Sequence, residues 1–262
     1  MDSRLNPNRP GMEGKLARIV FAATDVQKAP RRDAMRITQG LMGEDVRVYE
    51  RQEGWAYVQL TADGYVGYVE EEALAPTGLS ATHWLSVPSS FTYPAADLKT
   101  SPVEEIFFGA RLSITAIEDN YARTSEGRYL PLSHVKQIGE YRADPASIAT
   151  EFLHVPYLWG GKTARGLDCS GLIQLALNAC GIHVLRDTDM QEASLGRALE
   201  KGEALHRNDL VFWKGHVGIL SGPKTLIHAN GTYMQVVEEP LAEAIRRIAA
   251  TGSEVTSIRR FQ

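Results

Sequence analysis

The 262-residue sequence has an ordinary globular composition, and its 44% hydrophobic and 23% charged residues argue against long disordered segments. A formal net charge of −4 gives no electrostatic basis for binding nucleic acid or an anionic membrane surface. Its two cysteines form no disulfide framework and residues 1–10 lack the apolar stretch of an export signal, so we expect a cytoplasmic protein with neither nucleic-acid nor membrane partners.

Two segments in the N-terminal half of the chain repeat at a fixed spacing. In the first, Gly43 precedes an alternating strand and Trp55 follows 12 residues later. Gly109 and Tyr121 repeat this arrangement 66 residues further on (109 − 43). Period-2 alternation broken by turn residues predicts short antiparallel strands, and the repeated spacing favours two small β-barrels over one irregular β-domain. The predicted boundaries are 1–78 for an N-terminal arm with the first barrel and 79–139 for the second barrel.

From about residue 140 the pattern changes to short helices followed by strands. We expect helices over 145–153, 169–180, 189–199 and 240–249, and strands over 210–213, 217–220, 225–228 and 233–237. Helices that precede an antiparallel sheet are typical of an α+β domain, which we place at 140–262.

The candidate catalytic thiol lies at the start of the helix expected over 169–180. Cys169 opens this helix directly after Asp168, whose side chain is expected to cap it, while Gly171 is expected to keep the first turn thin enough for a substrate to approach. A helix N-terminus lowers the pKa of a thiol and offers backbone N–H groups to an oxyanion. His216 and His228 follow in strand-like segments, so a thiol, a base and a residue that orients the base occur in the papain-like order.

Other interpretations of these residues are weaker. Either histidine alone could be a packed strand residue, and only the combination with Cys169 favours catalysis. Cys180 is expected on the buried stripe of the same helix, roughly 16 Å from Cys169 and beyond the reach of a disulfide. The spacings fit no known zinc motif, so we expect no metal or other cofactor.

Motifs spread over residues 140–250 resemble, in order, those of the NlpC family of cell-wall cysteine peptidases. They are Tyr157-x-Trp159-Gly-Gly161, Asp168-Cys-Ser-Gly171-Leu, Asn208-Asp-Leu-Val-Phe-Trp213, His216-Val-Gly-Ile219 and Ile227-His-Ala229. Asn208 stands where the family usually has glycine, and asparagine tolerates the same turn. With two bacterial SH3-like units upstream, the chain resembles the γ-D-glutamyl-L-diamino-acid endopeptidases, which cleave the bond between γ-D-glutamate and a diamino acid in murein peptides.

The resemblance implies a role for each matching residue. Cys169 would be the nucleophile, His216 the base and His228 the residue that orients it. Tyr157 would lie beside the thiol and help to stabilise the oxyanion. Asp168 and Ser170 would bind the N-terminal L-alanine of the substrate, and Thr188 takes the place of a frequent serine in the substrate loop.

A comparison of the two repeats adds a prediction about selectivity. Glu44 follows Gly43 in the first repeat, whereas Ala110 takes the matching position in the second, so a barrel of this kind does not need a carboxylate there. If the first barrel packs over Cys169, Glu44 and Tyr65 would close the substrate groove and bind a free α-ammonium group by charge-assisted hydrogen bonds. The alternative for Glu44 is a solvated surface charge.

Three functions are therefore open. The first is a cysteine endopeptidase that recycles free murein peptides with an N-terminal L-alanine. The second is an exported peptidoglycan hydrolase that binds and cleaves intact cell wall, and the third is a papain-like amidase or acyltransferase. The apparent lack of an export signal favours the first, and the sequence specifies no oligomeric state.

Overall fold

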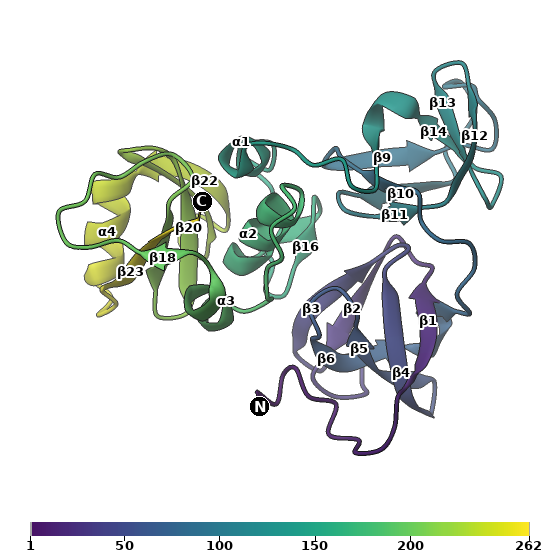
Figure 1. The fold of residues 1–262 in the computed structure, drawn as a ribbon, viewed down its shortest axis with the longest axis horizontal. Helices are drawn as coiled ribbons and strands as arrows, with labels where there is room; N and C mark the ends of the chain where they lie inside the picture. The colour runs from purple at the N-terminus through teal and green to yellow at the C-terminus, as the bar shows by residue number, and fades with distance from the viewer. Residues whose placement is uncertain (1, 262) are drawn as a thin grey trace. The chain divides into compact units, whose positions relative to one another are not determined.

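The computed structural model describes residues 2–261, which divide into two compact units between Glu140 and Tyr141. The first unit contains strands β1–β15, and the second contains helices α1–α4 together with strands β16–β23 (Figure 1). This mixture confirms the predicted α+β class. Over the described residues, none of the helices combines the length and apolar character needed to span a bilayer.

Residues 15–75 form the first barrel, a single antiparallel sheet with the strand order β3-β2-β6-β5-β4-β1-β7. The strands are Lys15–Ile19 (β1), Ala23–Gln27 (β2), Arg36–Leu41 (β3), Asp45–Gln52 (β4), Trp55–Leu60 (β5), Val66–Glu70 (β6) and Leu74–Ala75 (β7). Alternate residues point inward, so Val46, Val58 and Val69 are fully buried. A short 3₁₀ helix, Glu71–Ala73, precedes the last strand.

Residues 83–137 repeat this strand order in three pieces, β10-β9, β14-β13-β12 and β11-β8-β15. The strands are His83–Leu85 (β8), Ser89–Thr92 (β9), Glu104–Phe107 (β10), Arg111–Leu112 (β11), Ile114–Glu118 (β12), Tyr121–Thr124 (β13), Tyr129–Pro131 (β14) and Val135–Gln137 (β15), with a 3₁₀ helix at Leu132–His134. A register shift between Val48 and Glu50 recurs between Ile114 and Ala116, again 66 residues later. The strand order and the register shift of the first barrel therefore recur in the second, as the sequence repeat predicts.

The repeated glycines occupy equivalent turns. The N–H of Gly43 donates to Ile19 O at 2.9 Å, and that of Gly109 donates to Leu85 O at 2.8 Å. Both have positive φ, 79° and 88°, which favours glycine. Gly43 has a second constraint, because a Cβ there would lie 1.9 Å from Arg111 O, where the second barrel packs against the first. The two barrels thus form one compact unit, joined by a connection between β7 and β8.

The second unit has a six-stranded antiparallel sheet with the order β18-β23-β19-β20-β21-β22. Its strands are Arg197–Ala198 (β18), Leu210–Trp213 (β19), His216–Gly222 (β20), Thr225–Asn230 (β21), Gln235–Pro240 (β22) and Val255–Arg260 (β23), and a hairpin is formed by Lys162–Thr163 (β16) and Gly166–Leu167 (β17). The helices are Pro145–Thr150 (α1), Cys169–Asn178 (α2), Thr188–Ser194 (α3) and Leu241–Ala249 (α4). Figure 1 shows α1 and α2 on one side of this sheet and α4 on the other.

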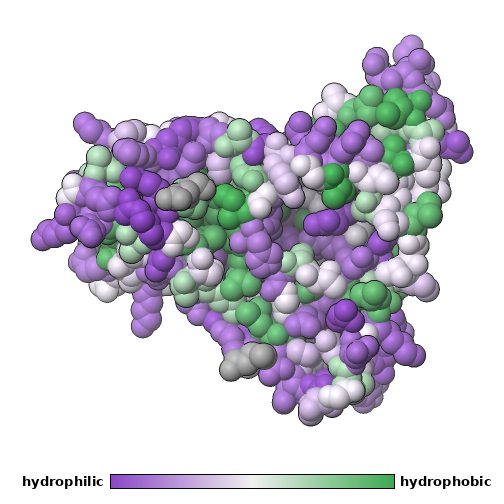
Figure 2. All heavy atoms as spheres, viewed as in Figure 1, coloured by the Kyte–Doolittle hydropathy of each residue, from purple (hydrophilic) through white to green (hydrophobic). Residues whose placement is uncertain are grey.

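Helix α4 is amphipathic. Its Leu241 and Ala244 pack with Trp213, Leu220 and Leu226 of the sheet in one hydrophobic cluster. Its opposite face is exposed, and the viewed surface over α4 is largely hydrophilic (Figure 2). This packing fixes α4 against strands β20, β21 and β22 of the sheet.

Several predicted boundaries in the second unit need correction. Helices α1, α2 and α3 all end earlier than expected, and β18 replaces the end of the predicted helix over 189–199. Strand β23 was not predicted, although it pairs with β19 inside the sheet. Because α2 ends at Asn178, Cys180 lies in the following turn and is half-buried rather than part of the buried stripe. Both cysteines are free thiols.

Candidate active site

Asp168 caps the helix that Cys169 opens. Its Oδ1 accepts the N–H of Gly171 at 2.7 Å, and its backbone is extended (φ −98°, ψ 175°), as at a helix N-cap. Gly171 serves this cap and not the approach of a substrate, since a Cβ there would lie 2.4 Å from Gly161 O and 2.9 Å from the Asp168 carboxylate. The cap thereby fixes the first turn of α2, where the thiol is located.

A buried ion pair holds the Asp168 carboxylate. Arg186, only 1% exposed, forms a bidentate ion pair with Asp168 and donates to Oδ1 at 3.0 Å and to Oδ2 at 2.7 Å. Arg186 also donates to Ser170 Oγ at 2.7 Å, and Gly160 N–H donates to Asp168 Oδ2 at 2.9 Å. Asp168 and Ser170, predicted to bind substrate, are therefore already engaged in holding the active-site helix. Sequence reasoning missed Arg186 as their partner.

The Cys169 thiol is buried next to the Asp168–Arg186 ion pair. Thr188 Oγ1 is 3.9 Å from Sγ, and the backbone N–H of Val217, next to His216, hydrogen-bonds to the sulfur. Burial, followed by the charge of Asp168, raises the pKa of the thiol to about 11. The expected lowering by the helix N-terminus is thus outweighed by desolvation, and the thiol is neutral at pH 7.

Tyr157 belongs to the same environment. Its backbone forms an isolated parallel bridge with Leu167, two residues before Cys169. Burial and the neighbouring Cys169 and Asp168 raise the pKa of its hydroxyl, so the group stays protonated and can donate a hydrogen bond. The predicted position of Tyr157 beside the thiol and its role at the oxyanion stay predictions.

The two histidines are in direct contact. His216 Nε2 lies 2.8 Å from His228 Nδ1, with His216 on β20 and His228 on the neighbouring strand β21. Burial lowers the pKa of His216 to about 4 and that of His228 to about 3, so both imidazoles are neutral at pH 7. A neutral imidazole can accept the thiol proton, and the contact leaves Nδ1 of His216 available for this purpose.

Three further residues surround His228, and sequence reasoning missed all of them. Glu239 Oε1 lies 2.7 Å from His228 Nε2, and Asn230 Nδ2 lies 3.1 Å from the same nitrogen. Arg247 of α4 forms an ion pair with Glu239. The register of β21 and β22 could have indicated Glu239. His228 pairs with Val237, so Glu239, two residues further along β22, is the diagonal neighbour of His228 on the same face of the sheet.

Glu44 and Tyr65 lie in the first unit, and their predicted approach to a substrate stays a prediction. Glu44 is 8% exposed, so the interpretation as a solvated surface charge is wrong. Its Oε2 accepts the N–H of Leu41 at 2.8 Å, which stabilises the turn before β4. Tyr65 is also buried, and Asp63 Oδ1 accepts its backbone N–H at 3.0 Å.

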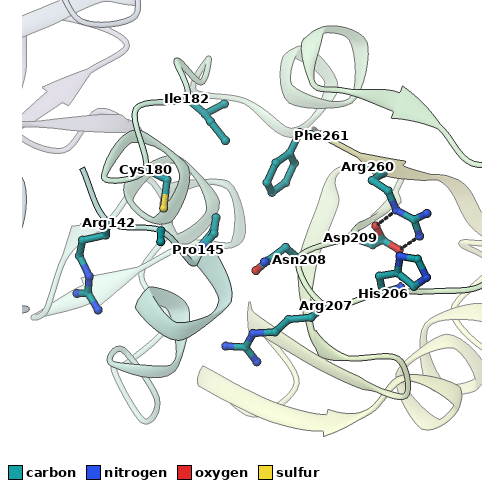
Figure 3. Close-up of a pocket in the computed structure, with 11 residues that line it drawn as sticks. Arg142, Pro145, Cys180, Ile182, His206, Arg207, Asn208, Asp209, Arg260 and Phe261 are labelled. Atoms are coloured by element: carbon teal, nitrogen blue, oxygen red, sulfur yellow. Dashed lines mark hydrogen bonds and ion pairs between the residues drawn. The ribbon is translucent and has the colours of Figure 1, made fainter. Parts of the chain in front are cut away.

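A hollow in the second unit, near Cys180, contains none of the predicted catalytic residues (Figure 3). Its lining arginines each have a carboxylate partner: Arg142 pairs with Glu151, Arg207 with Asp144 and Arg260 with Asp209. Asn208, the residue before Asp209, has a positive φ of 74°. This confirms the turn that was predicted at Asn208, where the family usually has glycine. The hollow is thus lined by ion pairs with a structural role near the start of β19. Over residues 2–261, no group of three or more His, Cys, Asp or Glu is placed to hold a metal ion.

Two sequence families match this chain. The bacterial dipeptidyl-peptidase SH3 domain matches residues 26–74, within the first barrel. The NlpC/P60 family matches residues 154–252, which include Cys169, His216 and His228. The second barrel repeats the strand order of the first, but the SH3 match covers the first alone.

Characterised relatives and solved structures agree with these matches. The chain is 29% identical to a γ-D-glutamyl-L-lysine dipeptidyl-peptidase of Bacillus subtilis over 79% of its own length and 77% of the relative's. It is 23% identical to dipeptidyl-peptidase 6 of Lysinibacillus sphaericus over 81% of the chain and 86% of that protein. The crystal structure of an NlpC/P60 family protein from Bacillus cereus superposes with a TM-score of 0.80 at 21% identity, covering 94% of this chain and 99% of the other. This superposition shows that the fold is shared across nearly the whole chain.

Proposed function

Because the chain joins a bacterial SH3 domain to a cysteine peptidase domain of the NlpC/P60 family, we propose that it hydrolyses the bond between γ-D-glutamate and a diamino acid in murein peptides. The observation that supports this proposal is the similarity, across both units of the chain, to a γ-D-glutamyl-L-lysine dipeptidyl-peptidase and to dipeptidyl-peptidase 6. The arrangement of Cys169, His216 and His228 supports the reaction type.

The proposed reaction begins with a neutral thiol and a neutral imidazole. His216 Nδ1 accepts the proton of Cys169 as the sulfur attacks the γ-carbonyl carbon of the glutamyl residue. The Cys169 N–H at the start of α2 and the Tyr157 hydroxyl stabilise the resulting oxyanion. When the tetrahedral intermediate collapses, the imidazolium donates its proton to the departing amine of the diamino acid and leaves a thioester. Water then attacks the thioester with His216 as base, which releases the acid and restores the thiol.

The finer specificity is part of the same proposal. We infer a preference for peptides with a free N-terminal L-alanine, for which Glu44 and Tyr65 are the candidate ligands in the first unit. A free α-ammonium group would pair with a buried carboxylate, whereas an N-acylated alanine would offer that carboxylate no positive charge. Such a site would select released peptides over intact wall.

One experiment tests the proposal and its alternative. The protein is incubated with L-Ala-γ-D-Glu-diaminopimelate, the corresponding lysine peptide, their N-acetyl forms and intact sacculi, and the products are identified by mass. We expect release of L-Ala-γ-D-Glu from the free-amine peptides only, and no release by the Cys169→Ala control. Cleavage of sacculi at a comparable rate would instead support a hydrolase of intact wall, and cleavage at another bond would contradict the proposed chemistry.

A further inference from the structure

The hydrogen bonds behind the histidine pair form a chain that leads to a carboxylate. We propose that Glu239 is a positioning residue: its carboxylate, held by Arg247, determines which nitrogen of His228 carries the proton and, through His228, which nitrogen of His216 is free to act as base. This inference rests on the proposed role of His216 as the base.

The Glu239 carboxylate determines the tautomer of His228. Its ring is fully buried, and its Nε2 lies 2.7 Å from Glu239 Oε1. An ionised carboxylate only accepts hydrogen bonds, so Nε2 must carry the proton. The same carboxylate, whose side chain is 8% exposed, forms an ion pair with Arg247.

The tautomer of His228 in turn determines that of His216. A neutral imidazole has one N–H, so proton placement on Nε2 of His228 makes its Nδ1 an acceptor. His216 Nε2, 2.8 Å away, must then be the donor. The lone pair of His216 is left on Nδ1, which is the nitrogen not engaged by His228. The low pKa values of the two rings keep both neutral, so their tautomers matter at pH 7.

A third residue opposes this arrangement. Asn230 Oδ1 accepts the N–H groups of Thr232 and Tyr233, both at 3.0 Å, so the amide presents its NH₂ group to His228 Nε2 at 3.1 Å. A donor facing Nε2 favours the opposite tautomer. The charged acceptor at the shorter distance, Glu239, outweighs the neutral donor. The active tautomer therefore depends on a negative charge at position 239.

The chain offers a well-matched test and control. Glu239→Gln removes the charge with little change in size and lets an amide donor face His228. Glu238→Gln makes the same charge change on the adjacent residue, which is exposed and hydrogen-bonds Ser221 instead of a histidine. Thermal unfolding verifies that both variants fold.

Three readouts separate positioning from a purely structural role. Steady-state kinetics gives kcat and KM on the murein peptide. The rate of alkylation by iodoacetamide is measured by peptide mass mapping at Cys169, with the half-buried Cys180 as an internal reference. Nitrogen-15 NMR of labelled histidine identifies the protonated ring nitrogen of His216 and His228 in the free protein.

For Glu239→Gln we expect kcat to fall by about 100-fold or more, while KM changes less than about threefold, because a base in the wrong tautomer cannot accept the thiol proton. The His216 proton should move from Nε2 to Nδ1, and alkylation of Cys169 should slow while that of Cys180 does not. Glu238→Gln should match the wild type in all three readouts.

Two results would overturn the inference. One is a Glu239→Gln enzyme whose kcat equals that of Glu238→Gln. The other is a wild-type spectrum with the His216 proton on Nδ1, a result that requires no variant and stands even if Glu239→Gln fails to fold. The spectroscopic and alkylation readouts need no peptide, so an error in the proposed substrate would leave them unchanged.

Discussion

Substitution of Arg186 by methionine should destabilise the second unit strongly, because it removes the partner of a buried carboxylate. Arg186 donates to both oxygens of Asp168 and to Ser170, and it is almost fully buried. Loss of one member of a buried ion pair costs about 3–5 kcal/mol, since the remaining charge has neither its partner nor water. For a unit of this size that corresponds to a fall of about 10–20 °C in melting temperature.

Differential scanning calorimetry of the full-length protein measures this effect, and the matched control is Arg197→Gln. Arg197 also forms a bidentate ion pair, with Glu203, but the Arg197 side chain is 52% exposed. Loss of this exposed ion pair should leave the melting temperature unchanged. Below its own melting temperature, Arg186→Met should also reduce kcat by about 10- to 100-fold, because the cap that positions Cys169 loosens. If Arg186→Met melts like Arg197→Gln, the argument from the buried pair is refuted.

The remaining predictions concern catalysis, pH, selectivity and location. Cys169→Ala should abolish hydrolysis with little change in melting temperature, and activity should survive EDTA; inhibition that zinc reverses would instead support a metal site. His216→Ala should be about as damaging as loss of the thiol, and His228→Ala less so. Burial holds the pKa values of His216 and His228, about 4 and about 3, below the unfolded value of about 6.5. The unfolded chain therefore takes up protons first, so the melting temperature of the second unit should fall as the pH drops from about 7 to 4, with a shallower slope in His228→Gln. Glu44→Gln should lower the preference for free-amine over N-acetylated peptides, and an unchanged ratio would exclude Glu44 from selectivity. Cell fractionation should recover the protein with cytoplasmic markers, and its appearance in the medium without lysis would contradict this location.

The sequence predicts features that depend on local pattern or fixed spacing. The 66-residue repeat between Gly43 and Gly109 is visible because each copy requires a positive-φ glycine and an aromatic residue at the same distance. The start of α2 at Cys169 is predictable because a capping aspartate precedes it.

Features that depend on tertiary contacts are not predictable in this way. The pairing of Arg186 with Asp168 joins residues 18 positions apart through the fold, and Glu239 meets His228 only through the register of β21 and β22. The pKa of Cys169 shows the same limit. A helix N-terminus is a local feature that lowers it, but the burial that raises it comes from the surrounding unit. Strand β23 escaped prediction because its residues are mostly half-buried and lack clear alternation.

The close approach at Gly43 bears on how such barrels can be recombined. Arg111 donates its backbone N–H to Met42 O at 2.8 Å, and its carbonyl fills the space beside Gly43. A gene fragment encoding only one barrel would expose this backbone donor or acceptor, and without the second barrel Ala22 and Met42 would lose the hydrophobic cluster on which they pack. The two barrels of this chain therefore cannot be exchanged separately. A chimaera made with a homologue should transfer both barrels together, as residues 15–137.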